Sequence, residues 1–259
     1  MKIITFNCFL TPWSLDRNKR LPFIFSALLK ENPDIIFLQE VFLKKDATYL
    51  VEKFNKIGFR ESIHSKDLLF LSKYPIISCE QRKLNNWVHF FSLSTVERLL
   101  KDVYQIIKVK VNNETITCIN LHLLEPYRDT SIYQKTRAGQ ITEICENVST
   151  EQNKIVMAGD FNFGMHTSPY EIVTEHFNFT DPLNHITAST FSMSNSNIQK
   201  STFVQNLVPK VIGQRIDHIF IRGFDQKKTS GEIVFTDKYV IGGENRNISD
   251  HYGLMLDID

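Results

Sequence analysis

Polar side chains able to bind a metal ion or a phosphate group stand at the ends of several apolar, strand-like runs. Six short motifs carry them: Asn7 in ITFNC, Glu40 in DIIFLQE, His122 in INLHL, Asp160 and Asn162 in MAGDFN, Asp217 and His218 in RIDHIF, and Asp250 and His251 in SDH. Carboxylate and amide oxygens are the ligands that hard divalent cations such as Mg²⁺ prefer. Because α/β proteins bind ligands at the ends of their strands, this pattern indicates a metal-assisted phosphate site.

Each motif is also open to a purely structural interpretation. Glu40 suits a loop entry, Asn7 suits a strand-ending turn, and Asp160 suits an Asx turn that closes a strand. A single histidine in a strand, such as His122, is more often a hydrogen-bonded core residue than a catalyst. Five separate strand ends nevertheless carry Asn, Asp, Glu or His, and together they favour one shared site over several unrelated turns.

Three motifs predict specific side-chain arrangements. If the chain stays extended after its strand, Asp160 and Asn162 point the same way. The carboxylate can then accept a proton from water while the amide orients that water or a phosphate oxygen. Asp217 lies within an apolar run, where a carboxylate is costly to bury alone, so we expect a His, Arg or metal beside it. An aspartate is expected to orient His251 and fix its tautomer, whereas His218 is predicted to be structural.

Strand-like and helical patterns alternate along the chain, which predicts a layered α/β domain. The strands are expected at 2–8, 34–38, 68–71, 76–82, 103–111, 115–121, 154–158, 216–222 and 252–258, and the helices at 20–31, 46–56 and 131–148. Residues 184–214 are rich in Ser, Thr and Asn and predict a long surface loop, a kind of segment that is often functional. No repeat or linker divides the sequence, so we expect one domain over residues 1–259.

The composition is that of a soluble globular protein, and the net charge of +1 argues against a strong electrostatic hold on a polyanion. The cysteines Cys8, Cys79, Cys118 and Cys145 are far apart, which predicts reduced, buried thiols rather than a disulfide framework. The first strand begins almost at Met1, and no apolar run reaches the ~20 residues of a transmembrane helix. We therefore expect no signal peptide and no membrane span, in a protein that is cytoplasmic or exported by a signal-independent route.

The motifs, in this order, resemble those of the endonuclease/exonuclease/phosphatase superfamily, which has the fold of pancreatic-type deoxyribonucleases. The resemblance extends from Lys2 to Asp259 and includes the segment LSKYPI at 71–76. It implies a four-layer α/β sandwich with two facing mixed β-sheets and a site at one end of the sheets.

The resemblance further implies a metal-dependent phosphodiesterase that uses Mg²⁺, with Mn²⁺ as an alternative ion. The residues implied at the metal centre are Glu40, Asn7 and Asp250. Asp160 and Asn162 are implied to position or activate the attacking water. His251, oriented by Asp217, is implied to act as general base or phosphate contact, and His122 to contact the phosphate and stabilise the transition state. The choice between Asp160 and His251 as the general base stays open.

Within the superfamily, the neutral sphingomyelinases are the most similar subgroup, on the start ITFNCFLTPW, the segment LQEVF and the stretch 122–140. This resemblance implies hydrolysis of sphingomyelin to ceramide and phosphocholine, with Tyr133, Arg137 and Trp87 as substrate-binding residues. Lys66-Asp67 stands where the subgroup usually carries glycine, a departure that concerns headgroup specificity more than the catalytic core.

Other functions of the same fold remain open from the sequence. A phospholipid hydrolase must touch a membrane surface, and Trp87, Phe90 and Phe91 suit such a transient contact because aromatic side chains favour the headgroup zone. The alternatives are a nuclease, a phosphatase of inositol phosphates or nucleotides, and a non-catalytic binding module. A nucleic acid is the less favoured partner because no concentrated basic cluster is visible, and we expect a monomer.

Overall fold

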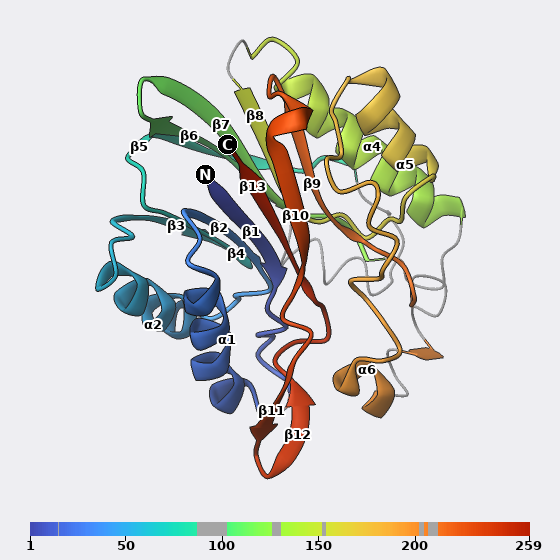
Figure 1. Ribbon diagram of the computed structural model, residues 1–259. Helices are drawn as coiled ribbons and strands as arrows, with labels where there is room; N and C mark the ends of the chain where they lie inside the picture. The colour runs from blue at the N-terminus through green and yellow to red at the C-terminus, as the bar shows by residue number, and fades with distance from the viewer. Residues whose placement is uncertain (15, 87–102, 126–130, 152–153, 202–204, 207–211) are drawn as a thin grey trace.

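Two β-sheets face each other in the computed structural model, and helices cover the outer side of each sheet (Figure 1). The structure describes residues 1–14, 16–86, 103–125, 131–151, 154–201, 205–206 and 212–259. Trp87, Phe90 and Phe91, which we proposed as a membrane-contacting lip, lie outside this part of the chain. The arrangement confirms the predicted α/β sandwich with two mixed sheets.

The first sheet has six strands in the order β10-β13-β1-β2-β4-β3. Their bounds are β1 (Lys2–Asn7), β2 (Ile35–Gln39), β3 (Glu61–Ser65), β4 (Leu68–Ser72), β10 (Thr229–Val234) and β13 (Gly253–Ile258). Strands β1 and β2 are parallel and the other neighbours are antiparallel. A parallel pair needs a crossover connection, which here contains α1 (Arg17–Glu31).

The second sheet has five strands in the order β5-β6-β7-β8-β9. Their bounds are β5 (Ile76–Lys83), β6 (Val103–Val111), β7 (Glu114–His122), β8 (Lys154–Asp160) and β9 (Asp217–Arg222). Only β7 and β8 are parallel among these neighbours, and their crossover contains α4 (Ser131–Asn147).

Three apolar clusters hold these layers together. One packs α1 and α2 (Lys44–Asn55) on the six-stranded sheet, a second fills the space between the sheets, and a third packs α4 on the five-stranded sheet. The cluster that packs α4 also includes residues of α5 (Ser168–Glu171) and of the π-helical turn η2 (Ile172–His176). Shorter elements complete the described chain: α6 (Ser196–Lys200), η3 (Gln226–Lys228), β11 (Lys238–Ile241) and β12 (Glu244–Asn247).

The topology brings the polar motifs to one edge of the sandwich. Carboxyl ends of parallel strands meet, and the pairing puts Asn7 beside Gln39 in one sheet and His122 beside Asp160 in the other. Strand β9 runs antiparallel to β8 and starts at Asp217, which pairs with Asp160. Strand β13 runs antiparallel to β1 and therefore also starts at this edge, two residues after His251.

The sequence pattern does not predict four of the strands, which are more polar than the others. Strands β3, β10, β11 and β12 carry few consecutive apolar residues because they lie at sheet edges or in a separate hairpin. The β11–β12 turn contains Gly242 and Gly243, both with positive φ, which is the usual chemistry of a tight hairpin turn.

The prediction of a surface loop over 184–214 is wrong for part of that stretch. Thr190, Asn195, Ser196 and Asn197 are buried, because their side chains bond to other loops and not to solvent. Cys8, Cys118 and Cys145 are buried and free as predicted, whereas the free Cys79 is exposed on edge strand β5. Within the described ranges, no helix is both long enough and apolar enough to cross a membrane.

Candidate active site

The Asp160 carboxylate lies between two imidazole rings at the edge where the strands meet. Its Oδ2 atom is 3.5 Å from His122 Nε2 and 3.7 Å from His251 Nε2. All three side chains are buried. The sandwich therefore joins residues from β7, from β8 and from the loop before β13 into one cluster.

Each imidazole also bonds to a second carboxylate, through its Nδ1 atom. His122 Nδ1 lies 2.8 Å from Asp67 Oδ2, and His251 Nδ1 lies 2.9 Å from Asp217 Oδ2. Carboxylates that accept from Nδ1 fix the ring orientation and the tautomer, so both Nε2 atoms face Asp160. The histidine expected beside Asp217 is thus His251.

Asp67 is a site residue that the sequence analysis did not assign. It is fully buried in the turn between β3 and β4, after Lys66 with its left-handed φ of 54°. The available signal was a carboxylate directly before the apolar run of β4, the same kind of signal that singled out Asp217. We had interpreted Lys66-Asp67 only as a departure from glycine.

Asn7 connects the two sheets of the site. Its Nδ2 donates to Glu40 Oε1 at 3.2 Å and to Asp160 Oδ2 at 3.0 Å, while its Oδ1 accepts from Phe9 N at 3.0 Å. The amide nitrogen, rather than the oxygen, thus faces the carboxylates in this arrangement. Direct metal ligation by Asn7 would need the opposite amide orientation, which sacrifices the bond from Phe9.

The Gly-Asp-Phe-Asn motif makes a tight turn rather than an extended strand. Asn162 has φ of 54°, and its backbone N–H donates to Asp160 Oδ1 at 3.0 Å, as in an Asx turn. The condition of an extended chain is therefore not met, and the alternative Asx turn is the arrangement observed, although both residues are buried at the site. Gly159 is needed here because a Cβ atom would lie 2.0 Å from the backbone oxygen of Leu121.

The Ser249-Asp250-His251 loop is fastened to the end of β1. Ser249 Oγ donates to the backbone oxygen of Asn7 at 2.7 Å and lies 3.3 Å from Asp250 Oδ1. The fully buried Arg20 donates to the backbone oxygens of Cys8 and Ile248 at 3.0 and 2.8 Å. These bonds bring Asp250 to the same edge as Asn7.

Burial and mutual charge strongly perturb these groups. Burial raises the pKa of Asp160 and of Asp250, and the Asp217 carboxylate raises that of Asp160 further. Burial by itself would lower the pKa of His251, but Asp217, Asp160 and Asp250 outweigh it and hold the pKa well above 6.5. Carboxylates that are so costly to keep ionised are stabilised by a bound cation.

The donor set fits a hard divalent cation. Ligand atoms of Glu40, His122 and Glu125 lie within 4.8 Å of one another, and so do those of Asp160, Asp217 and His251. Glu40 also adopts a left-handed φ of 58°, a costly conformation for a glutamate that persists at functional sites. Glu40 can therefore serve as a ligand with neighbouring carboxylate oxygens, since hard cations take oxygen ligands.

Two of the residues implied to bind substrate, Tyr133 and Arg137, lie on α4 and not among the residues that surround Asp160. Arg137 is buried on α4, and its Nη1 reaches the backbone oxygen of Leu124 at 3.5 Å. Tyr133, on the same helix, is partly buried against the apolar cluster beneath it. Arg137 thus contacts the segment that follows His122, and Trp87 is outside the described residues.

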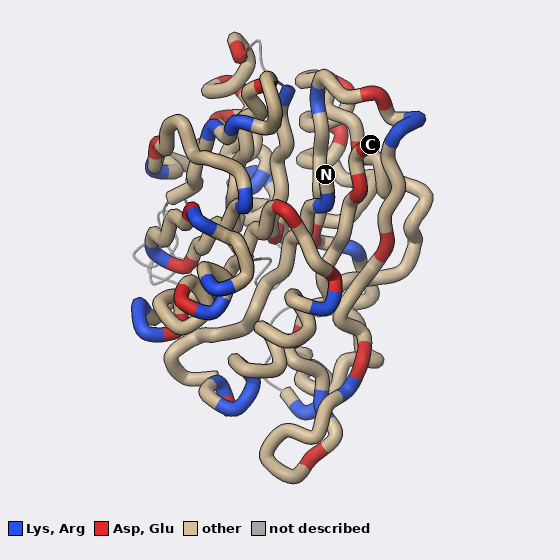
Figure 2. The backbone as a smooth tube through the Cα atoms, turned by 60° about the vertical axis from the view of Figure 1, so that its left-hand side comes forward, with Lys and Arg blue, Asp and Glu red and all other residues tan. Residues whose placement is uncertain are grey.

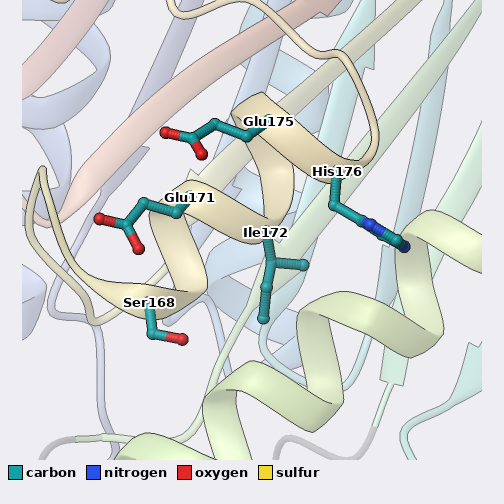
Figure 3. A pocket seen from close by; sticks show the side chains of 5 residues that line it. All are labelled: Ser168, Glu171, Ile172, Glu175 and His176. Carbon is teal, nitrogen blue, oxygen red and sulfur yellow. The ribbon is translucent and has the colours of Figure 1, made fainter.

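A pocket of about 400 Å³ lies on α5 and η2 and does not include the clustered carboxylates and imidazoles (Figure 3). Ser168, Glu171, Ile172, Glu175 and His176 line it, and the two glutamates point to the same side. None of the clustered carboxylates and imidazoles lines this pocket, so the proposed chemistry does not involve it.

Comparison with known proteins agrees with this geometry. Residues 4–251 match the model of the Endonuclease/Exonuclease/phosphatase family. The chain belongs to this family.

Two relatives and one solved structure illustrate the similarity. A Drosophila melanogaster protein described as a neutral sphingomyelinase is 24% identical over 98% of this chain, which spans 60% of that protein. An inositol phosphosphingolipids phospholipase C of Schizosaccharomyces pombe is 23% identical over 98% of this chain and 67% of its own length. A magnesium-bound mutant of beta toxin from Staphylococcus aureus is 17% identical, has a TM-score of 0.75, and covers 100% of this chain and 99% of its own.

Replacement of Glu40 by glutamine tests the metal site. Saturating Mg²⁺ should raise the Tm of the unaltered protein by about 5 °C at a hundredfold excess over Kd, and Glu40→Gln should remove this shift. The measurement is thermal unfolding with and without Mg²⁺ after treatment with EDTA. Glu171→Gln, in the pocket of Figure 3, is the matched control and should keep the full shift; retention of the shift in Glu40→Gln would refute the assignment.

Replacement of Asp67 by asparagine tests its orienting role on His122. We expect kcat for phosphodiester hydrolysis to fall roughly 10- to 100-fold, with a small change in KM, because the neutral amide no longer fixes the imidazole. Asp34→Asn is the control, since Asp34 bonds to Lys2 and Lys73 at the opposite end of the strands. Equal losses in both variants would show that Asp67 has no specific role.

Proposed function

We propose that this protein is a metal-dependent phosphodiesterase that hydrolyses a sphingolipid headgroup ester, with sphingomyelin giving ceramide and phosphocholine. The observation that carries the proposal is the continuous array Asp67–His122–Asp160–His251–Asp217. Two imidazoles that are each oriented by a carboxylate and converge on a third carboxylate suit water activation and phosphate binding.

In the proposed reaction, a water molecule attacks phosphorus while the bond from phosphorus to the ceramide oxygen breaks. Asp160 accepts the proton of this water, because the raised pKa of His251 favours its protonated form, which donates to a phosphate oxygen. His122 Nε2 and the Asn162 amide contact the remaining phosphate oxygens as charge builds on them. The departing ceramide oxygen takes up a proton from solvent and leaves as an alcohol, and Asp160 returns its proton to solvent.

Mg²⁺ is the proposed ion, with Mn²⁺ as an alternative. Glu40 is its proposed main ligand, and Asn7 and Asp250 are proposed to lie close to it. When bound, such an ion polarises a phosphate oxygen and stabilises charge on the leaving group. The hard oxygen donors support this choice, as does the magnesium bound in the beta toxin structure.

The sphingolipid part of the proposal rests on the names of both relatives and on an aromatic pair of which one ring is exposed. Trp13 is 68% exposed, and its ring centroid lies 6.4 Å from that of Phe42. The two residues follow Asn7 and Glu40 in the loops after β1 and β2. Aromatic side chains beside the site suit a transient contact with a lipid surface.

Hydrolysis of nucleic acid, inositol phosphates or nucleotides is the second candidate, since the same core residues would serve. A nuclease should present a basic groove for the phosphate backbone. In the described chain, Lys and Arg are interleaved with Asp and Glu (Figure 2), and the net charge is +1. A non-catalytic binding module is disfavoured because the whole array of oriented imidazoles is retained.

A panel of substrates separates these candidates. We expect Mg²⁺-dependent release of phosphocholine from sphingomyelin in mixed micelles, and much slower turnover of phosphatidylcholine, DNA and inositol phosphates. Phosphocholine release and the loss of each other substrate are measured at equal enzyme concentration, with EDTA as the metal-free control. Hydrolysis of DNA with none of sphingomyelin would overturn the lipid proposal and leave the phosphodiesterase proposal standing.

Replacement of Trp13 by alanine tests the lipid contact. We expect about a tenfold rise in the vesicle concentration that gives half the maximal rate, since burying one large apolar side chain contributes about 1.5–3 kcal/mol. The rate on a soluble phosphodiester should not change. Ile77→Ala is the control, because Ile77 is 55% exposed on β5 at the opposite edge; an equal effect in both variants would contradict a specific role for Trp13.

A further inference from the structure

Residues 190–197 contact both members of the Asp217–His251 pair from outside the catalytic cluster. This segment belongs to the Ser/Thr/Asn-rich stretch predicted to be a surface loop. Asp217 starts β9 in the five-stranded sheet, whereas His251 precedes β13 in the six-stranded sheet. Because the two residues belong to different sheets, no strand pairing sets the distance between them.

Thr190 bridges the two sheets at this point. Its Oγ1 accepts from the backbone N–H groups of Ile216 and Asp217 at 3.1 and 3.3 Å. Its backbone oxygen accepts from Tyr252 N at 2.8 Å. One fully buried residue therefore bonds to the chain at Asp217 and to the residue after His251.

Phe191 packs on the catalytic imidazole itself. Its ring centroid lies 4.9 Å from that of His251, with an angle of 51° between the planes. Its backbone N–H donates to Gln214 O at 3.2 Å, three residues before Asp217. The Phe191 ring thus limits the movement of the His251 imidazole, while the Phe191 backbone is bonded to the chain before β9.

Two buried asparagines hold the backbone before Asp250. Asn195 Nδ2 and Asn197 Nδ2 both donate to the backbone oxygen of Ser249, at 2.9 and 2.8 Å. Asn195 Oδ1 separately accepts from Asn197 N at 2.9 Å and caps α6. The Asn195 amide thus donates to Ser249 through its nitrogen and caps α6 through its oxygen, so the two bonds use different atoms.

We propose that residues 190–197 form a positioning element that sets His251 against Asp217 and Asp160, with Thr190 and Asn195 as its principal bonds. The proposal rests on the proposed phosphodiesterase function for its kinetic consequences only. Every bond named ends on backbone or on a ring face, so these residues act through the catalytic groups and do not touch the substrate.

Thr190→Val is the principal test, because valine keeps the shape of threonine and removes the acceptor. We expect kcat on the soluble probe bis(4-nitrophenyl) phosphate to fall roughly 10- to 100-fold with little change in KM, since a small misplacement of a catalytic group has effects of this size. Thr190→Ser keeps the hydroxyl and should recover most of the rate. Thr117→Val is the matched control, since Thr117 is equally buried but bonds to Glu151 far from the site.

Asn195→Asp covers the case in which Thr190→Val fails to fold. The aspartate keeps the acceptor that caps α6, but a carboxylate oxygen replaces the donor to Ser249. Because this carboxylate is buried and faces a carbonyl oxygen, we expect a lower Tm and, at a temperature where the variant is folded, a fall in kcat. Full kcat in a folded Asn195→Asp or Thr190→Val variant, equal losses in Thr190→Ser and Thr190→Val, or an equal loss in Thr117→Val would overturn the proposal.

A spectroscopic signature separates this proposal from the proposed function. Protons on His251 Nδ1 and His122 Nδ1, each bonded to a buried carboxylate, should give low-field proton resonances, assigned with His251→Ala and His122→Ala. In Thr190→Val the His251 resonance should shift or broaden, while the His122 resonance stays unchanged as an internal control. If the unaltered protein hydrolyses no phosphodiester, this change still supports the positioning element, and two unchanged resonances would refute it.

Discussion

The burial of several carboxylates around two imidazoles is the constraint on which the rest of this structure depends. Asp160 is buried beside Asp217, and burial opposes its ionised form. It is held by the Asn7 amide, by the backbone N–H of Asn162 and by two histidines. A cluster of this kind is costly in isolation, and it persists because hydrogen bonds from many separate segments fix each member.

The mixed sheets supply the framework for that cluster. The two parallel pairs, β1–β2 and β7–β8, each bring two strand ends to one edge, and the facing of the sheets joins these ends into one site. Antiparallel β9 and β13 then start at the same edge. The fold thus links the six sequence motifs through successive side-chain contacts of 2.9–3.7 Å, although they are spread over most of the chain.

The motifs and the layered α/β character could be predicted because apolar runs and their polar ends are local properties of the sequence. The two-sheet sandwich was implied by the family resemblance that the motifs carry. The need for a His, Arg or metal beside Asp217 also followed from the cost of burying a lone carboxylate, and the family resemblance implied that this partner is His251. Asp67 was missed because it lies in a turn, where an aspartate is ordinary. The orientation of the Asn7 amide and the turn at Asn162 depend on neighbours distant in sequence, and no periodicity reports them.

The sequence by itself determined which residue types stand at the strand ends, and hence the family and the kind of chemistry. The family resemblance implied the Asp217–His251 pair, whereas the tertiary structure alone decided that Asp67 holds His122, since this contact joins two separate segments. The tertiary structure also decided that residues 190–197 are partly buried. The physical reason is that Ser, Thr and Asn side chains can form hydrogen bonds both to water and to the backbone. Composition alone therefore does not distinguish an exposed loop from a buried segment that bonds to its neighbours.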